Sequence, residues 1–180
     1  MEKGYIHIYT GYGKGKTTAS LGVAFRAIGN GMKVAIGQFI KSKGVRYNES
    51  NAIQLINNIG APLGSVHIEQ FGEGCCIHGC PADTDKAGAL KGWDKVKEWI
   101  FSGEYDVVIL DELNIALHLK LIPIEEVIDV LTKKPEKMEI IITGRHAPQE
   151  LIDFADLVTE MKEIKHYYRQ GVLAREGIDR

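Results

Sequence analysis

The sequence has few cysteines, no excess of positive charge and no long apolar run. Its three cysteines are an odd number gathered in one loop, which argues against a disulfide framework. Lysine and arginine together number 22 against 24 aspartates and glutamates, so the formal charge of -2 offers no electrostatic basis for binding nucleic acid. No stretch approaches the ~20 consecutive apolar residues of a membrane helix, and no secretory leader is visible. We therefore expect a cytoplasmic protein that binds neither nucleic acid nor membrane.

The 180 residues are enough for a single domain, which we expect to span residues 1–180. Hydrophobic residues make up 44% of the chain and charged residues 26%, as in ordinary globular proteins. A domain of this length buries about 70% of the surface that its unfolded chain exposes. The chain therefore has enough apolar material to fold without disulfides.

Short β-branched and apolar segments alternate along the chain with segments of helical periodicity. Strands are expected at residues 4–10, 33–40, 65–71, 105–110 and 139–143, and a sixth candidate follows at 157–161. Helices are expected at residues 17–28, 48–58, 83–102, 114–118, 124–132 and 149–154. This alternation predicts an α/β fold: a doubly wound, largely parallel sheet of five or six strands with helices on both faces.

A glycine-rich loop, TGYGKGKTT, stands between the first expected strand and the first expected helix. Its glycines let backbone N–H groups converge on phosphate oxygens, and the helix N-terminus adds partial positive charge. Lys16 supplies a full charge for the phosphates and Thr17 a hydroxyl for Mg²⁺. The usual spacing G-x-x-x-x-G-K-[ST] puts Thr10 where the first glycine belongs, and counting from Gly11 makes the loop one residue short. A plain turn is the alternative, but the context favours a P-loop (RecA-like) nucleotide-binding domain.

Two acidic residues, Asp111 and Glu112, follow the apolar run VVIL. They fall at the carboxyl end of a strand that is expected to be buried on both faces. Ligands of open α/β sheets bind at that edge, and carboxylates there hold Mg²⁺ directly or through water. The alternative is a helix cap, but two adjacent acids after four apolar residues fit the metal role better.

The segment CCIHGC brings Cys75, Cys76, His78 and Cys80 close together in sequence. Such side chains bind zinc or iron in many proteins. The segment lacks the C-x-x-C pair of common zinc sites, and adjacent cysteines rarely both reach one metal. We therefore favour a loop of small residues with reduced thiols over a metal centre.

Several motifs in order resemble the P-loop ATP:corrinoid adenosyltransferases. They are YTGYGKGKTT at 9–18, QFIK at 38–41, VILDELNIA at 108–116, ITGRHAP at 142–148, ADLVTEM at 155–161 and the pair Lys165-His166. The resemblance covers residues 3–180. It implies transfer of the adenosyl group of MgATP to the cobalt of a reduced corrinoid such as cob(I)alamin, with inorganic triphosphate leaving. It also implies a homodimer and an electron-donating reductase as partner.

The resemblance assigns roles to individual residues. It places nucleotide binding on Gly11, Tyr12, Gly13, Lys14, Gly15, Lys16, Thr17 and Thr18. It places the metal-side acid on Glu112, with Asp111 beside it, and ligand charge on Arg145, while Thr17 is the metal-side hydroxyl of the loop. Lys16 and Glu112 are accordingly the catalytic candidates.

The corrinoid-facing part departs from the family pattern. Some members have an aromatic pair in a stretch reading G-F-T-W after the third strand, where this chain has residues 74–77, GCCI. Other candidates stay open between ligand contact and an ordinary core or solvated role: Phe39, Phe71, Ile77, Lys41, Lys43, Arg46, His146 and His166.

Two other functions fit the same residues. The first is an ATPase or kinase that cleaves at the γ-phosphate, for which the glycine loop and the acidic pair would serve equally. The second is a non-enzymatic carrier of adenosylcobalamin. The nucleotide product distinguishes the first alternative, and turnover against stoichiometric binding distinguishes the second.

Overall fold

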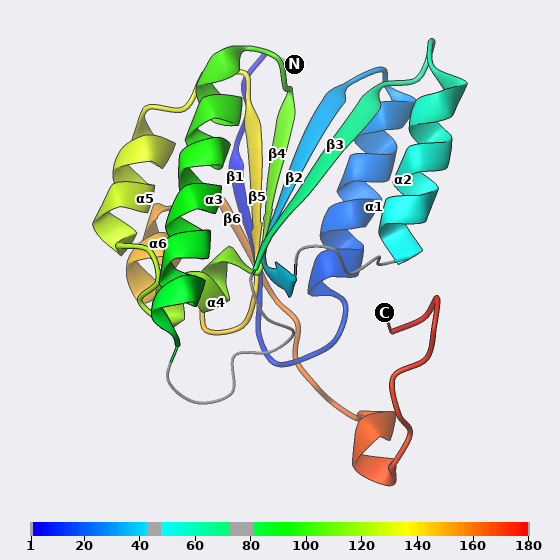
Figure 1. Ribbon diagram of the computed structural model, residues 1–180, viewed down its shortest axis with the longest axis vertical. Helices are drawn as coiled ribbons and strands as arrows, with labels where there is room; N and C mark the ends of the chain where they lie inside the picture. Colours follow the sequence, from blue (N-terminus) through cyan, green and yellow to red (C-terminus); the bar gives the residue numbers. More distant parts are fainter. Residues whose placement is uncertain (1, 43–47, 73–80, 180) are drawn as a thin grey trace.

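The computed structural model describes residues 2–42, 48–72 and 81–179. Within these ranges six strands form one sheet in the order β3-β2-β4-β5-β1-β6, and all neighbouring pairs are parallel (Figure 1). The strands are β1 (Ile6–Thr10), β2 (Lys33–Ser42), β3 (Ser65–Gly72), β4 (Val107–Asp111), β5 (Glu139–Thr143) and β6 (Leu157–Glu160). The predicted parallel α/β sheet is confirmed, and the sixth candidate strand is part of it.

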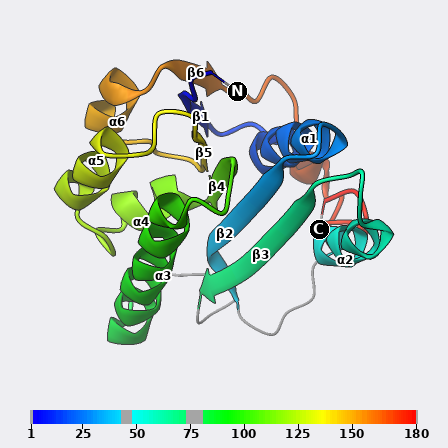
Figure 2. The ribbon, with the colours of Figure 1, turned by 90° about the horizontal axis from the view of Figure 1, so that it is seen from above.

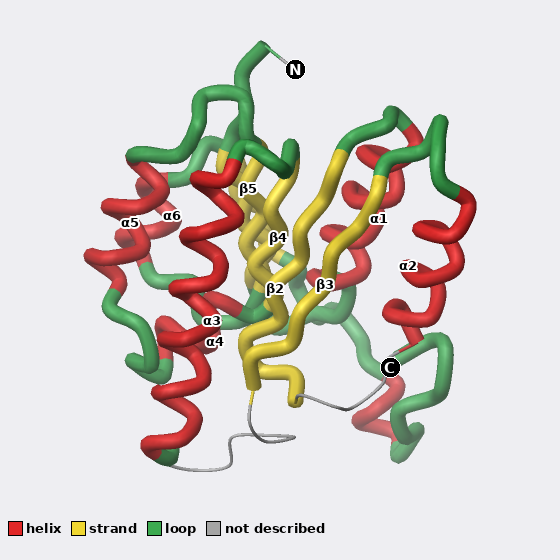
Figure 3. Tube along the Cα trace, turned by 45° about the horizontal axis from the view of Figure 1, so that its top comes forward, coloured by secondary structure: helices red, strands yellow, loops and turns green. Residues whose placement is uncertain are grey.

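Helices cover both faces of this sheet. On one face lie α1 (Lys16–Gly29) and α2 (Asn48–Ile59). On the other lie α3 (Asp83–Ser102), α4 (Leu113–His118), α5 (Ile124–Thr132) and α6 (Gln149–Phe154), as Figures 1 and 2 show. A short 3-10 helix, η1 (Tyr167–Gln170), follows β6 and stands apart from these layers (Figure 1), and Figure 3 shows the strands between the two groups of helices. No helix of the described ranges is both long and apolar enough to cross a membrane.

The two-residue period of the strands separates the core into two layers. Ile140 and Ile142 of β5 belong to the cluster that packs under α3, α4 and α5, together with the fully buried Trp93. Ile141, between them, points to the opposite face and packs with residues of α1 and α2. A strand buried on both faces must be apolar at every position, which explains why EIIIT and VVIL show no alternation.

Two strands begin two residues later than their sequence patterns suggest, β1 at Ile6 and β4 at Val107. Side chains bond to the backbone at both starts: the Tyr5 N–H donates to the Glu139 carboxylate (2.6 Å), and the Asp106 carboxylate accepts from the Lys33 N–H (2.8 Å). Backbone bonds between neighbouring strands continue there, since the Asp106 N–H donates to the Lys33 carbonyl oxygen (2.9 Å) and the Tyr5 carbonyl oxygen accepts from the Ile140 N–H (2.9 Å). The side-chain bonds therefore add to the ladder at its ends.

Close packing of α3 on β3 depends on a glycine. A Cβ added to Gly92 would lie 2.4 Å from Cγ of Phe71, which is itself buried. Gly92→Ala should therefore lower the free energy of unfolding by about 1–3 kcal/mol through overpacking. Gly22 of α1, where nothing lies within 4 Å of an added Cβ, is the control. Gly22→Ala should raise stability by up to about 1 kcal/mol, as expected for a helix interior. Urea unfolding measures both, and an unchanged midpoint for Gly92→Ala would contradict the close approach.

Candidate active site

The glycine loop, residues 11–15, connects β1 to α1 at the carboxyl edge of the sheet. Gly11 and Gly15 have φ angles of 94° and 117°, a region that residues with a Cβ rarely adopt. A Cβ on either Gly11 or Gly13 would lie 2.6 Å from the Met161 carbonyl oxygen, to which the Gly13 N–H donates (2.6 Å). The loop therefore takes its shape from glycine and from the segment that follows β6.

Lys16 opens α1 and turns its ammonium back into the loop. It donates to the carbonyl oxygens of Gly11 and Gly13, each at 2.8 Å, and the residue is 7% exposed. Burial lowers the pKa of Lys16, and the charge of Glu112 opposes that shift. Since the first turn of α1 contains no acidic residue, positive charge from the lysine and the helix N-terminus is concentrated here.

Asp111 ends β4 as a buried carboxylate, 1% exposed, with donors from three separate elements. Its Oδ1 accepts from the hydroxyls of Thr17 and Thr143, both at 2.8 Å, and its Oδ2 accepts from the Gln38 amide at 3.2 Å. The Lys41 ammonium lies 3.7 Å from Oδ2. Asp111 therefore ties the start of α1 to β2 and β5.

Glu112, the next residue, takes a different direction. Its φ angle of 61° is unusual for a residue with a side chain. The Thr143 hydroxyl holds this turn by accepting from the Glu112 N–H (3.0 Å). Burial raises the pKa of Glu112, and the charge of Asp111 adds to that shift. Among the described residues no hydrogen bond reaches the Glu112 carboxylate, which is thus available to a ligand.

The loop after β5 closes this part of the edge. Gly144 has a φ angle of 131°, and a Cβ there would lie 2.9 Å from Cβ of Asn114 and 3.1 Å from Oε2 of Glu112. The neighbouring Arg145 places its guanidinium 5.8 Å from the ring centre of Tyr12. The glycine at 144 therefore allows the loop to pack against Asn114 and Glu112 and to place Arg145 beside Tyr12 of the glycine loop.

Two hollows open beside the glycine loop. The inner hollow, of about 350 Å³, is bordered by Lys14 and Glu112, and the outer hollow, of about 880 Å³, by charged residues of the segment after β6. Both are also lined by Tyr12, Arg145, His166 and Tyr168. Together they give a ligand access to the glycine loop, the Glu112 carboxylate and the Arg145 guanidinium.

Most predicted site residues meet at this edge, and the structure adds detail for three of them. The Lys14 ammonium donates to the Ile178 carbonyl oxygen (2.8 Å). Thr18 is exposed on the first turn of α1. His146 has its ring centre 5.3 Å from that of Tyr12 and 4.3 Å from that of His118, and it lines a further hollow of about 480 Å³.

The other sequence candidates divide into two groups. Phe39 and Phe71 are buried and pack against each other with ring centres 5.4 Å apart, which makes them part of the core. His166 lines both hollows, and Lys41 pairs with Glu49 of α2 as well as approaching the acidic site. The remaining candidates lie outside the described residues: Lys43, Arg46, Cys75, Cys76, Ile77, His78 and Cys80.

Sequence reasoning assigned no role to Gln38 or Thr143, the residues that complete the Asp111 network. Thr143 follows the apolar run III and ends β5, and Gln38 follows the apolar run VAIG of β2 and pairs in register with Asp111, the last residue of β4. That position is the signal that could have identified them, since carboxyl ends of parallel strands share one edge. In the described part of the chain, no three His, Cys, Asp or Glu side chains gather in a way that could hold a metal ion.

The parallel doubly wound sheet, with a glycine loop at its carboxyl edge, defines an α/β protein of the P-loop type. Comparison with known proteins is more specific. The family model for the ATP:corrinoid adenosyltransferases BtuR/CobO/CobP matches residues 2–179. The chain therefore belongs to this family.

Individual relatives agree over almost the whole chain. A corrinoid adenosyltransferase of Sinorhizobium sp. is 41% identical over 99% of this chain and 81% of its own length. Those of Escherichia coli K12 and Salmonella typhimurium are 35% and 36% identical, over 99% of this chain and 86% of their own lengths.

The raised pKa of Glu112 predicts a pH-dependent cost to folding. A carboxyl whose pKa is higher in the folded state stabilises the fold below its unfolded pKa and loses that contribution as the pH rises through the folded pKa. Glu112→Gln should therefore raise the melting temperature at pH 7, and the gain should shrink as the pH falls into the ordinary glutamate range. Glu98→Gln, at a side chain 67% exposed, is the control and should change little. A gain for Glu112→Gln that does not depend on pH would contradict this assignment.

Proposed function

We propose that this protein transfers the 5′-deoxyadenosyl group of MgATP to the Co(I) centre of a reduced corrinoid, releasing inorganic triphosphate. Family membership supports the proposal. The observation that supports it for these residues is the placement of Lys16 and the buried Asp111 network at one sheet edge, where the Glu112 carboxylate lines a hollow.

The triphosphate is assigned to the glycine loop. The backbone N–H groups of residues 11–18 and the ammonium of Lys16 are its ligands, and Arg145 adds charge from the opposite side. Two N–H groups of the Lys16 ammonium already donate to loop carbonyl oxygens, which fixes the direction of the third N–H. Preorganised donors of this kind stabilise charge that grows on a leaving group.

Mg²⁺ would be held by Glu112 and the Thr17 hydroxyl together with phosphate oxygens, and Asp111 would act mainly by orienting Thr17. The donor set fits, because hard carboxylate and hydroxyl oxygens suit Mg²⁺, which usually binds few protein groups and keeps phosphate or water ligands. When bound, the ion neutralises charge on the triphosphate. The two carboxylates thus have different tasks, since the Oδ1 of Asp111 already accepts two hydroxyl hydrogens.

The reaction requires no general base. Co(I) is itself a strong nucleophile, so the cobalt–carbon bond forms at C5′ while the C5′–O bond breaks and the triphosphate leaves with the electron pair. The protein contributes by placing C5′ over the cobalt, with the leaving group directed away in line. Lys16 and Arg145 then stabilise the departing charge, whereas Glu112 serves the metal.

The proposal includes three further features that rest on the family resemblance and the composition. The protein acts as a homodimer, receives its electron from a reductase that produces Co(I), and works in the cytoplasm with its thiols reduced. The electron must arrive before alkylation, because Co(I) is the nucleophile.

Loss of the loop ammonium should abolish activity. Lys16→Ala removes the charge that faces the leaving group, and kcat/KM should fall at least about 10²-fold, the usual cost of one preorganised donor. The fold should persist, because burial of this lysine is a cost to stability. Lys95→Ala, at an exposed residue of α3, is the control. Turnover within a few-fold of wild type would contradict the phosphate assignment.

The identity of the products tests the reaction itself. Incubation with MgATP and cob(I)alamin under strong reductant should give a light-sensitive alkylcobalt product and inorganic triphosphate in equal amounts. ATP should survive when corrinoid is omitted. Corrinoid-independent release of ADP and phosphate would favour the ATPase, and stoichiometric binding of adenosylcobalamin without turnover would favour the carrier.

A further inference from the structure

The chain after β6 folds back over the glycine loop and ends on Lys14. The Lys14 ammonium donates to the Ile178 carbonyl oxygen (2.8 Å) and forms an ion pair with the Asp179 carboxylate. The same carboxylate accepts from the Tyr167 hydroxyl and from the Arg175 N–H (3.1 Å). With its side chain only 10% exposed, Asp179 is the centre of a cluster that joins the two ends of the chain.

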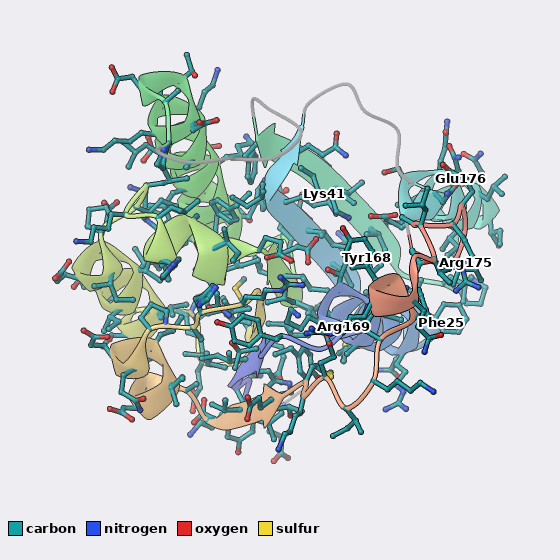
Figure 4. The ribbon with its side chains drawn as sticks, turned by 90° about the horizontal axis from the view of Figure 1, so that it is seen from below. Phe25, Lys41, Tyr168, Arg169, Arg175 and Glu176 are labelled. Atoms are coloured by element: carbon teal, nitrogen blue, oxygen red, sulfur yellow. The ribbon has the colours of Figure 1, made fainter. Side chains whose placement is uncertain are left out.

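A second contact fixes the far side of residues 166–179, here called the C-terminal segment. The Asn48 amide at the start of α2 donates to the Glu176 carboxylate (2.9 Å). Within the segment, the Arg175 guanidinium lies 4.8 Å from the ring centre of Tyr167. Figure 4, which views the carboxyl edge, shows the segment running from η1 past α1 to α2, with Arg175 and Glu176 beside that helix. The segment therefore spans from the glycine loop to α2.

This segment supplies one side of the inner hollow. Its residues there are His166, Tyr167, Tyr168, Val172, Ala174 and Asp179. Across from them lie Tyr12, Glu112 and Arg145. Tyr12 and Tyr168 line the hollow although 59% and 68% of their surfaces are exposed. Exposed aromatic rings in a concave site are surfaces on which a nucleobase can stack.

Lys14 and Lys16 have different surroundings although both belong to the glycine loop. Lys16 is bound to loop carbonyls, whereas Lys14 extends to the C-terminal segment. The Lys14 ammonium, followed by the Tyr167 hydroxyl, holds the pKa of Asp179 well below its usual range. The charge of Lys14 is therefore matched by Asp179, which suits a structural link better than a phosphate ligand.

We propose that the C-terminal segment is the outer wall of the nucleotide site and receives the nucleoside part of ATP, while the glycine loop receives the triphosphate. Asp179 is the positioning residue that holds this wall on Lys14, and Tyr168 is the contact to the nucleoside. The identity of the ligand rests on the proposed function.

Two ligands distinguish binding at the C-terminal segment from binding at the glycine loop. Inorganic triphosphate with Mg²⁺ probes the loop alone, whereas MgATP probes loop and wall, and calorimetry gives both Kd values. Asp179→Asn should raise amide hydrogen exchange across 167–178 and the Kd for MgATP by about tenfold, as expected for loss of bonds to a charged group. It should leave the Kd for triphosphate within about twofold, since the bonds of Lys16 to the loop carbonyls do not involve Asp179. Tyr168→Ala should raise the Kd for MgATP and leave the Kd for triphosphate unchanged.

Asp129→Asn is the matched control, because that carboxylate is 60% exposed and pairs with Lys133, the residue that follows α5. Equal weakening of triphosphate and MgATP in Asp179→Asn would overturn the proposal by making Lys14 and Asp179 part of the phosphate site. Unchanged exchange would overturn it as well, whatever the ligand. If Tyr168→Ala alters the KM for the corrinoid and leaves MgATP binding unchanged, the C-terminal segment contacts the corrinoid and not the nucleoside. If wild type binds neither nucleotide nor triphosphate, the proposed function fails, and the exchange comparison still decides whether Asp179 holds the segment.

Discussion

The buried carboxylate of Asp111 is the group on which the rest of the site depends. A charge removed from water costs several kcal/mol unless donors replace its hydration. Here the donors come from Thr17 at the start of α1, Gln38 in β2 and Thr143 at the end of β5. Because they belong to three elements, satisfying one carboxylate also fixes how these elements meet. The position of the glycine loop relative to the sheet follows from this network.

The neighbouring Glu112 shows how a single peptide bond separates two environments. Asp111 is surrounded by donors, whereas Glu112 faces a hollow and carries a raised pKa. The left-handed backbone at Glu112 causes the difference, and the Thr143 hydroxyl, which contacts both residues, keeps it in place. A buried acid in a left-handed turn, with no hydrogen bond to its carboxylate from the described residues, is typical of functional sites, where a local cost to stability leaves a group ready to bind a ligand.

Much of this architecture could be predicted from the sequence, because apolar runs and turn residues report local structure directly. EIIIT and VVIL marked the central strands, and the glycine loop marked the edge that carries the site. The position of Gln38 and Thr143 after apolar runs pointed to this edge, but their bonds to Asp111 could not be predicted, because the strand order β2-β4-β5 brings the three residues together. The direction of the Lys14 side chain was equally inaccessible, because its partner Asp179 lies at the far end of the chain.

The dependence of the glycine loop on Met161 has a consequence for biosynthesis. β1 lies between β5 and β6, and its first residue, Ile6, already bonds to Asp156, 150 residues further along. β1 leaves the ribosome before β5 and β6, the strands beside it, and before Met161, whose carbonyl supports Gly13. Long-range pairing of this kind is slow to form and leaves early segments without their neighbours. The nascent chain therefore carries its glycine loop without the surroundings that shape it, and the site for the nucleotide is completed only after β6 and the segment behind it have been made.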